Sequence, residues 1–253
     1  MIEAANLIPS GPTRTWGKQV NAPNMLKAIL DAAENQEPFA YVQDEPIFKI
    51  NRITNIDEYV AFDIIKKKPQ IVFYSQVKPN RTRNNLFKPH IGRYQSMVWK
   101  HKPWFNHAYF ATDFILGVLL KDSEMNPMVI TDMEQTEYGM NMWIHTLIVA
   151  MHKGYKCYYG LSTPSDAKCI IRLEDAEDVD VHYDGDIVNE GSQYAYRCAL
   201  ITKPNVDVST LLQDPNHTLI LTNTEAEELG AYTNPEVLTL DEESRMISEH
   251  YSH

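Results

Sequence analysis

The spacing of apolar and polar residues divides the chain into short helices and strands. Apolar side chains recur every three or four positions from Met140 to Met151, as on the buried face of a helix. A similar but shorter pattern lies near the N-terminus. These patterns predict helices over 24–35 and 138–153, with Gly154 ending the second.

Shorter runs rich in β-branched and aromatic residues predict strands. The predicted strands are 38–43, 46–53, 70–77, 128–131, 156–160, 168–173, 179–183, 193–203 and 218–222. Further helices are expected over 55–67, capped by Asn55, and over 107–121. A capping box of Thr224 and Glu227 predicts a short helix near the C-terminus. The intervening stretch 78–107 is interrupted by prolines and predicts a long irregular connection.

The order of these elements indicates the fold class. A strand over 128–131, the helix over 138–153 and a strand over 156–160 predict a crossover that joins a parallel pair. We therefore expect an α/β fold, with α+β as the alternative: a mixed sheet with a strand–helix–strand centre and a β-rich C-terminal third. The expected organisation is an extended N-terminal arm over 1–22, a single α/β domain over 23–240 and a polar C-terminal tail over 241–253.

Composition excludes several classes of protein. With 43% hydrophobic residues, 10 Gly and 14 Pro, the chain is neither collagen-like nor of low complexity. It holds no apolar run long enough to cross a bilayer, and its N-terminus has no basic start followed by an apolar core. Three widely spaced cysteines fit neither a disulfide framework nor a zinc site. We expect a cytoplasmic protein without a membrane partner. Its composition, rich in Met, Tyr and Asn, is phage-like, and a phage protein would lie in the host cytoplasm or in the virion.

The distribution of charge changes this picture. The net charge is −11, yet ten Lys and Arg and no acid lie between Ile64 and Lys102. Aromatic residues, among them Trp99 and Trp104, are interleaved with these cations, and we call residues 64–107 the basic-aromatic segment. Conversely, the stretch from Glu174 to Glu190 holds eight acids and no Lys or Arg.

Cations beside aromatic rings are the composition of a site for phosphates and stacked bases. The leading hypothesis is therefore a protein that contacts nucleic acid or a nucleotide, and a candidate modifying transferase. The alternative is a non-catalytic assembly or inhibitor protein, such as a viral component. It would dock its basic segment on an acidic protein surface, including the 174–190 region of a second copy in a homo-oligomer. The predicted nucleic-acid contacts are Arg81, Arg83, Lys88, Arg93, Trp99, Lys100, Lys102 and Trp104.

Three titratable residues are candidates for catalysis. Asp132 and Glu134 follow a predicted parallel strand, where ligands of open α/β sheets bind, and His107 borders the basic-aromatic segment. The alternative interpretation is structural: Asp132 caps a turn, and His107 is an ordinary surface residue. For a divalent cation, the candidate ligands are Asp184 and Asp186, although a tight turn explains this pair better. His145 is expected to be exposed or to face a second layer.

Standard motifs for P-loop, Rossmann, serine-hydrolase and zinc sites are absent. A third hypothesis, an acyltransferase, rests on the helix that ends in His152, Lys153 and Gly154 before a strand. The Gly-rich pyrophosphate loop that such enzymes place before this helix is missing from the sequence.

Overall fold

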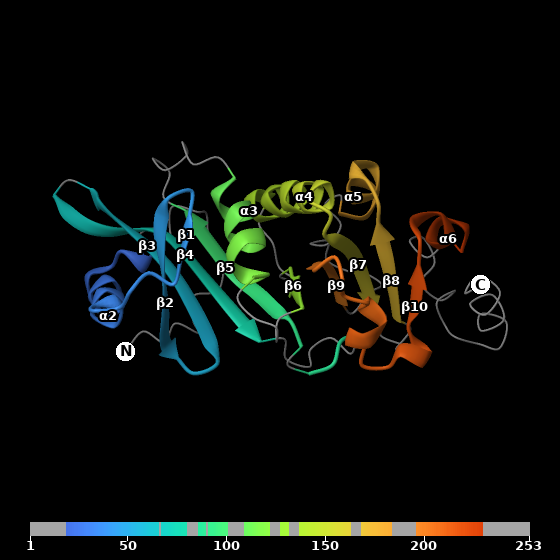
Figure 1. Ribbon diagram of the computed structural model, residues 1–253, viewed down its shortest axis with the longest axis horizontal. Coiled ribbons are helices and arrows are strands. Elements are labelled where there is room, and N and C mark those ends of the chain that lie inside the picture. Colours follow the sequence, from blue (N-terminus) through green and yellow to red (C-terminus); the bar gives the residue numbers. More distant parts are fainter. Residues whose placement is uncertain are drawn as a thin grey trace.

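A computed structural model describes residues 19–65, 67–79, 86–89, 91–100, 109–121, 127–131, 137–162, 168–183 and 196–229. Residues 79, 93–100, 137–140, 162, 180–183 and 196–197 are described by their backbone alone. Over this part of the chain, ten strands form one sheet in the order β1-β2-β3-β4-β5-β6-β9-β7-β8-β10, with helices packed against it (Figure 1). The predicted α/β class with a mixed sheet and a β-rich C-terminal part is confirmed.

The elements have the following bounds. The strands are β1 (Ala40–Val42), β2 (Glu45–Ile53), β3 (Ile56–Ile65), β4 (Lys68–Pro79), β5 (Arg93–Lys100), β6 (Met128–Ile130), β7 (Lys156–Ser162), β8 (Lys168–Leu173), β9 (Tyr196–Thr202) and β10 (Leu219–Leu221). The helical segments are α2 (Pro23–Ala33), α3 (Phe110–Phe114) continued by the π-helical η3 (Ile115–Leu119), α4 (Glu137–His152), α5 (Ala176–Tyr183), the 3₁₀ turns η5 (Val208–Leu211) and η6 (Pro215–His217), and α6 (Asn223–Glu228).

The N-terminal half of the sheet is an antiparallel meander of β1 to β5. The predicted helix over 55–67 is wrong, because this segment is β3. Asn55 has a φ of 62° in the turn between β2 and β3 instead of capping a helix. Tyr59, Val60 and Ala61 are then all buried, since β3 lies between two neighbouring strands and both of its faces are covered.

The expectation of an irregular connection over 78–107 is also wrong in part. Its residues 93–100 form β5, which pairs with β4 from Phe73 opposite Lys100 to Pro79 opposite Arg93. Of its other residues, 86–89 and 91–92 belong to no helix or strand, and 80–85, 90 and 101–107 lie outside the described residues. The apolar residues of β5 are Tyr94 and the three-residue run Met97–Trp99, shorter than the run that identified β4, so its strand character depends on the long-range pairing.

The C-terminal half contains the predicted strand–helix–strand unit of β6, α4 and β7. Its two strands run in the same direction, but they do not pair with each other. Instead β9 lies between them and is antiparallel to both. The expected parallel pair at this point is therefore wrong, while β8 and β10 do pair in parallel.

Two local predictions in this half need correction. The predicted strand over 179–183 belongs to the helix α5, because Asp175 Oδ1 accepts the backbone N–H of Asp178 at 3.0 Å and so caps the helix start. The predicted capping box occurs two residues earlier. Thr222 and Glu225 form it at the start of α6, since β10 already ends at Leu221.

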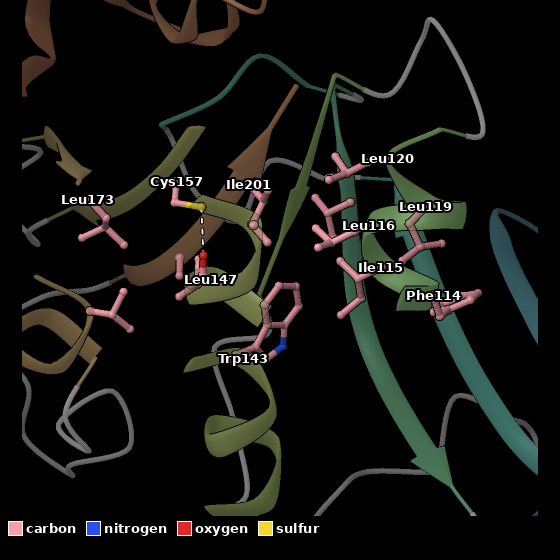
Figure 2. Close-up of a cluster of buried hydrophobic side chains, with 14 of the residues drawn as sticks. Phe114, Ile115, Leu116, Leu119, Leu120, Trp143, Leu147, Cys157, Leu173 and Ile201 are labelled. Carbon is pink, nitrogen blue, oxygen red and sulfur yellow. Dashed lines mark hydrogen bonds between the residues drawn. The ribbon is translucent and has the colours of Figure 1, made fainter. Parts of the chain in front are cut away.

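One face of the sheet carries the main hydrophobic core. The helices α3, α4 and α5 lie along this side in Figure 1, and their apolar side chains meet alternate residues of the strands. Figure 2 shows Trp143 and Leu147 of α4 between the η3 side chains and the strand residues Cys157 and Ile201. Trp143 is 2% exposed, which confirms the predicted amphipathic assignment of this helix.

The opposite face has two smaller clusters. The helix α2 covers β2 to β4, where it packs on Ile50, Val60 and Ile71. The end of the predicted N-terminal arm is held here too, because the Asn21 side chain exchanges two hydrogen bonds with the backbone of Ile71, at 3.0 and 2.9 Å. Residues 1–18 and the predicted tail over 241–253 lie outside the described residues.

Trp143→Ala should lower the free energy of unfolding by about 3–5 kcal/mol, because a large buried ring is replaced by a cavity. Asn141→Ala is the matched control, since Asn141 is an exposed residue of the same helix and should change stability by less than about 0.5 kcal/mol. Urea unfolding followed by circular dichroism measures both. Equal losses for the two variants would contradict the packing of α4.

Candidate functional site

The two halves of the sheet are joined along a short stretch of β5 and β6. These strands are parallel and pair at two positions, Arg93 with Val129 and Tyr94 with Ile130. Among the described residues, no strand pairs with 95–100 on the side that faces away from β4. Within the described part of the chain, the backbone N–H and C=O groups along this side of 95–100 therefore have no strand ladder.

Gly92 makes the junction between β5 and β6 possible. Its φ is +79°, a conformation that glycine adopts without the steric cost of a side chain. A Cβ at this position would lie 2.5 Å from Cγ of Met128, the first residue of β6. Glycine is therefore required both by the backbone angle and by the close approach of the second strand.

The carboxyl ends of β5 and β6 point to the same edge of the sheet, because the strands are parallel neighbours. The chain leaves β5 there toward α3 and leaves β6 toward α4. The predicted catalytic residues belong to these two connections, but His107, Asp132 and Glu134 all lie outside the described residues. The topology relates the two connections, and it does not test the roles predicted for these side chains.

The predicted nucleic-acid contacts are described only in part. Arg93, Trp99 and Lys100 belong to β5, of which the backbone alone is described. Lys88 is exposed, and its Nζ donates to the Thr210 carbonyl oxygen at 2.8 Å. Outside the described residues lie Arg81, Arg83, Lys102, Trp104 and the predicted metal ligands Asp184 and Asp186.

Several aromatic residues of the basic-aromatic segment are structural. Phe73, Tyr74 and Phe87 are fully buried and offer no ring surface to a ligand. Phe87 belongs to a cluster on the face opposite α3 and α4, where Lys88 N donates to the Leu211 carbonyl oxygen at 2.9 Å. The middle of the segment is thus fixed against η5, which places Lys88 on the other face of the sheet from the two helices.

A polar cluster occupies the contact between α3 and α4. Thr112 of α3 lies 2.8 Å, Oγ1 to Oγ1, from Thr146 of α4, and 3.2 Å from Nδ1 of His145. The ring of Tyr109, the residue that caps α3, stacks on the His145 imidazole with centroids 4.1 Å apart and planes 4° from parallel. Tyr109 has a φ of 65°, which is uncommon for a residue with a side chain.

The environment of His145 favours its neutral form. Partial burial lowers the pKa of the imidazole, and the opposing attraction of the nearby Asp113 carboxylate does not compensate for it. His145 was expected to be exposed or to face a second layer, and the structure places it against α3. Thr112 lies 33 residues before His145 in the sequence, and Tyr109 lies still earlier. Neither contact could therefore be predicted from local spacing.

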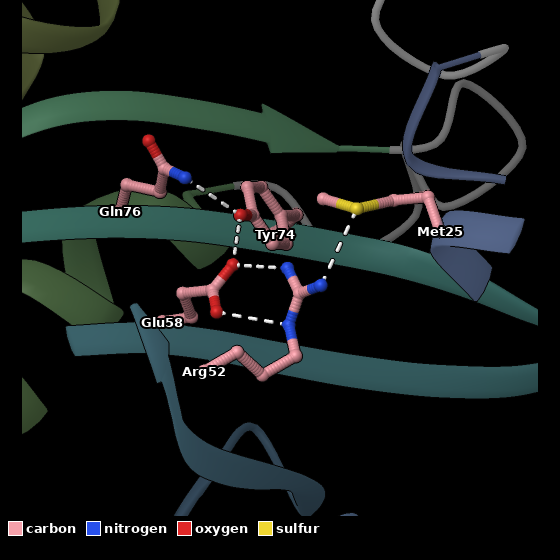
Figure 3. Close-up of polar contacts among 5 residues, drawn as sticks. All are labelled: Met25, Arg52, Glu58, Tyr74 and Gln76. Atoms are coloured by element: carbon pink, nitrogen blue, oxygen red, sulfur yellow. Dashed lines mark hydrogen bonds and ion pairs between the residues drawn. The ribbon is translucent and has the colours of Figure 1, made fainter. Parts of the chain in front are cut away.

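A second polar cluster is buried beneath α2 (Figure 3). Glu58 of β3 accepts two hydrogen bonds from the Arg52 guanidinium, at 3.0 and 2.5 Å, and a third from the Tyr74 hydroxyl. The Gln76 amide donates to the Tyr74 oxygen at 2.8 Å, and Arg52 also reaches Sδ of Met25 in α2. Glu58 and Tyr74 are fully buried, so this cluster is closed to a ligand and holds α2 on the sheet.

Comparisons with known proteins do not name a family: no family model, curated protein or solved structure matches this chain. Within the ranges that the structure describes, no three His, Cys, Asp or Glu side chains are arranged to hold a metal ion. The same part of the chain contains no helix that is long and apolar enough to span a membrane.

Gly92→Ala should destabilise the protein more than Gly154→Ala. Both glycines have a positive φ, near 80°, but an added Cβ at Gly154 meets nothing within 4 Å. The shared backbone strain costs about 1–2 kcal/mol, and the contact with Met128 adds about 1–3 kcal/mol for Gly92 alone. Urea unfolding of both variants measures the difference, and equal losses would show that β5 and β6 are not tightly joined at Gly92.

Tyr74→Phe should reduce the loss of stability at alkaline pH. Burial, followed by the Glu58 carboxylate, raises the pKa of Tyr74 above its ordinary value of 10.0. The unfolded chain then ionises first, so the stability contributed by the neutral hydroxyl is complete below about pH 10 and declines above it. Tyr41→Phe, at a residue that is 66% exposed, is the control. Unfolding free energies measured from neutral pH to about pH 11 should decline less steeply in Tyr74→Phe alone; identical slopes would contradict the assignment.

Proposed function

We propose that this protein is a transferase that binds a nucleotide-bearing group donor where β5 and β6 separate. The observation that carries the proposal is the β5–β6 junction, which ends after two residue pairs and leaves 95–100 of β5 without a partner on that side among the described residues. Ligands of α/β sheets bind beyond the carboxyl ends of parallel strands, and helices begin after both of these ends.

The charges of the chain divide between the two sides of this junction. Arg93 and Lys100 lie in β5, and Lys102 follows it, whereas Asp132 and Glu134 follow β6. A basic side suits the phosphates of a donor, and an acidic side suits proton transfer from an acceptor. Of the predicted acid–base group, Asp132 and Glu134 thus follow β6 on the acidic side, whereas His107 belongs to the connection that follows β5.

Among nucleotide-bearing donors, an acyl thioester of coenzyme A fits best. Its extended arm carries amides, and an unpaired strand edge binds extended amide-bearing chains by main-chain hydrogen bonds. The sequence has no Gly-rich loop before α4, so we assign the phosphates to cations on the β5 side instead. A nucleic-acid strand fits less well, since Lys88 is held on the other face of the sheet from α3 and α4.

Calorimetric titration with coenzyme A, ATP and a short single-stranded DNA tests the proposal. We expect coenzyme A to bind, and Lys100→Ala with Lys102→Ala to weaken it at least about tenfold, since a charged hydrogen bond contributes about 1.5–3 kcal/mol. Lys88→Ala is the matched control from the same segment and should leave this affinity unchanged.

The other hypotheses give different results. If DNA alone binds, and replacing Arg81, Arg83, Lys88 and Arg93 by Ala flattens the log–log salt dependence by up to about 2.8 units, the protein is a single-strand binder. In that case Trp99→Ala or Trp104→Ala should cost about 1–3 kcal/mol with little change of slope. If no probe binds and light scattering shows self-association, the non-catalytic assembly hypothesis replaces the proposal.

A further inference from the structure

Hydrogen bonds between α3 and α4 fix the proton positions around His145. The Thr146 hydroxyl donates to the Met142 carbonyl oxygen at 2.7 Å, which uses its single proton. At the 2.8 Å contact between the two threonines, Thr112 is therefore the donor. Since the Thr112 proton is now used as well, the contact at 3.2 Å must be donated by Nδ1–H of His145. The imidazole is held as the tautomer with its proton on Nδ1.

This arrangement leaves Nε2 as a proton acceptor. Within the described part of the chain, Nε2 has no hydrogen-bond partner, while Nδ1 is engaged. Both threonines are buried, Thr146 completely, so the acceptor that orients Nδ1–H is rigid. The Tyr109 ring covers one face of the imidazole and is itself 62% exposed, which puts the pair at the surface of the helical layer.

The position of His145 relates it to the proposed site. Tyr109 is the first described residue of the path from β5 into α3, and α4 follows β6. The contact between α3 and α4 is thus the place in the helical layer where the chains leaving β5 and β6 meet again, as Thr112 and Thr146 show.

We infer that the proton acceptor of this site is His145, acting through Nε2, in place of the predicted group of Asp132, Glu134 and His107, with Thr112 and Thr146 as positioning residues. The inference rests on the proposed function. As an acceptor amine attacks the thioester carbonyl, a C–N bond forms and the C–S bond breaks with its electron pair on sulfur. The proton lost by the amine goes to Nε2 of His145 and then to the leaving thiolate, so that the products are an amide and coenzyme A.

The charges around His145 agree with this role. From α3, Asp113 raises the pKa of the imidazole, but its carboxylate is also engaged by the Gln43 amide at 2.7 Å and by Lys153 of α4 at 3.7 Å. Partial burial is the larger effect and lowers the pKa. The imidazole is consequently neutral near pH 7, as a base must be before it accepts a proton.

The state of the imidazole can be measured without any substrate. Nitrogen NMR of the histidines, with His145 assigned from His145→Asn, should show the proton on Nδ1 and a pKa below the ordinary histidine value. Thr112→Val should shift the proton toward Nε2, and Thr112→Ser, which keeps the hydroxyl, should restore it. A proton on Nε2 in the parent protein overturns the inference whatever the protein binds.

Activity separates this inference from the proposed function. With acetyl-coenzyme A and a panel of primary amines, thiol release by the parent protein should rise with pH as His145 loses its proton. His145→Asn retains an N–H near Nδ1 but lacks the base, so the rate should fall at least about 100-fold while coenzyme A affinity is retained. An unchanged rate and pH profile in His145→Asn overturns the role of His145 alone. Failure of the parent to bind coenzyme A overturns the proposed function, and the NMR result then decides whether His145 is held as a base.

Discussion

Two residue pairs, Arg93 with Val129 and Tyr94 with Ile130, hold the halves of the sheet together. They lie at the beginning of β5, beside Gly92, and at the end of β6; among the described residues, 95–100 of β5 have no strand partner on the side that faces away from β4. The helices make the second tie. Phe110 and Phe114 of α3 pack on Phe73 of the N-terminal half with centroids about 5 Å apart, while Leu147 of α4 accepts a hydrogen bond from the Cys157 thiol of the C-terminal half. The contact between α3 and α4 therefore connects the two halves of the sheet a second time, within the layer of helices.

The polar cluster beneath α2 and the polar cluster between α3 and α4 differ in charge and in exposure. Beneath α2, the charges of Arg52 and Glu58 satisfy each other, and the Tyr74 hydroxyl gives Glu58 a further hydrogen bond; Glu58 and Tyr74 are fully buried, and Arg52 is mostly buried. Removing either charge from such a pair is costly because its partner stays buried, so this cluster is suited to holding a helix and not to moving a proton. Between α3 and α4 the polar groups are neutral, and His145 is only partly covered, although both threonines are buried. The hydroxyls orient one edge of the His145 ring, and the other edge is not engaged by any described residue.

Sequence patterns predicted the elements whose cause is local. The helix α4 and the strands β4 and β8 follow directly from apolar spacing, and Gly154 ends α4 with a φ of 81° as its type suggests. The errors share a physical reason. The strand β3 resembles a helix in sequence because both of its faces are buried, and β5 has no apolar run longer than three residues. Both become strands because of β4, to which they pair. The position of β9 between β6 and β7 could not be predicted either, because the spacing of residues along the chain does not determine the order of strands in a sheet.

The site was predictable to a different degree from the fold. The distribution of charge and the predicted strand ends indicated candidate residues near β5 and β6. The sheet brings the carboxyl ends of these two strands to one edge. His145 gave no such signal, because its meaning comes from Thr112, which lies 33 residues earlier in the sequence. A histidine on the outer face of an amphipathic helix is usually a solvated residue. Here α3 supplies a buried hydroxyl that donates its proton to Thr146 and so can only accept from His145, and that contact orients the imidazole for the role of base that we propose. The chemistry that we propose for this protein therefore depends on the contact between α3 and α4, which no local pattern in the sequence indicates.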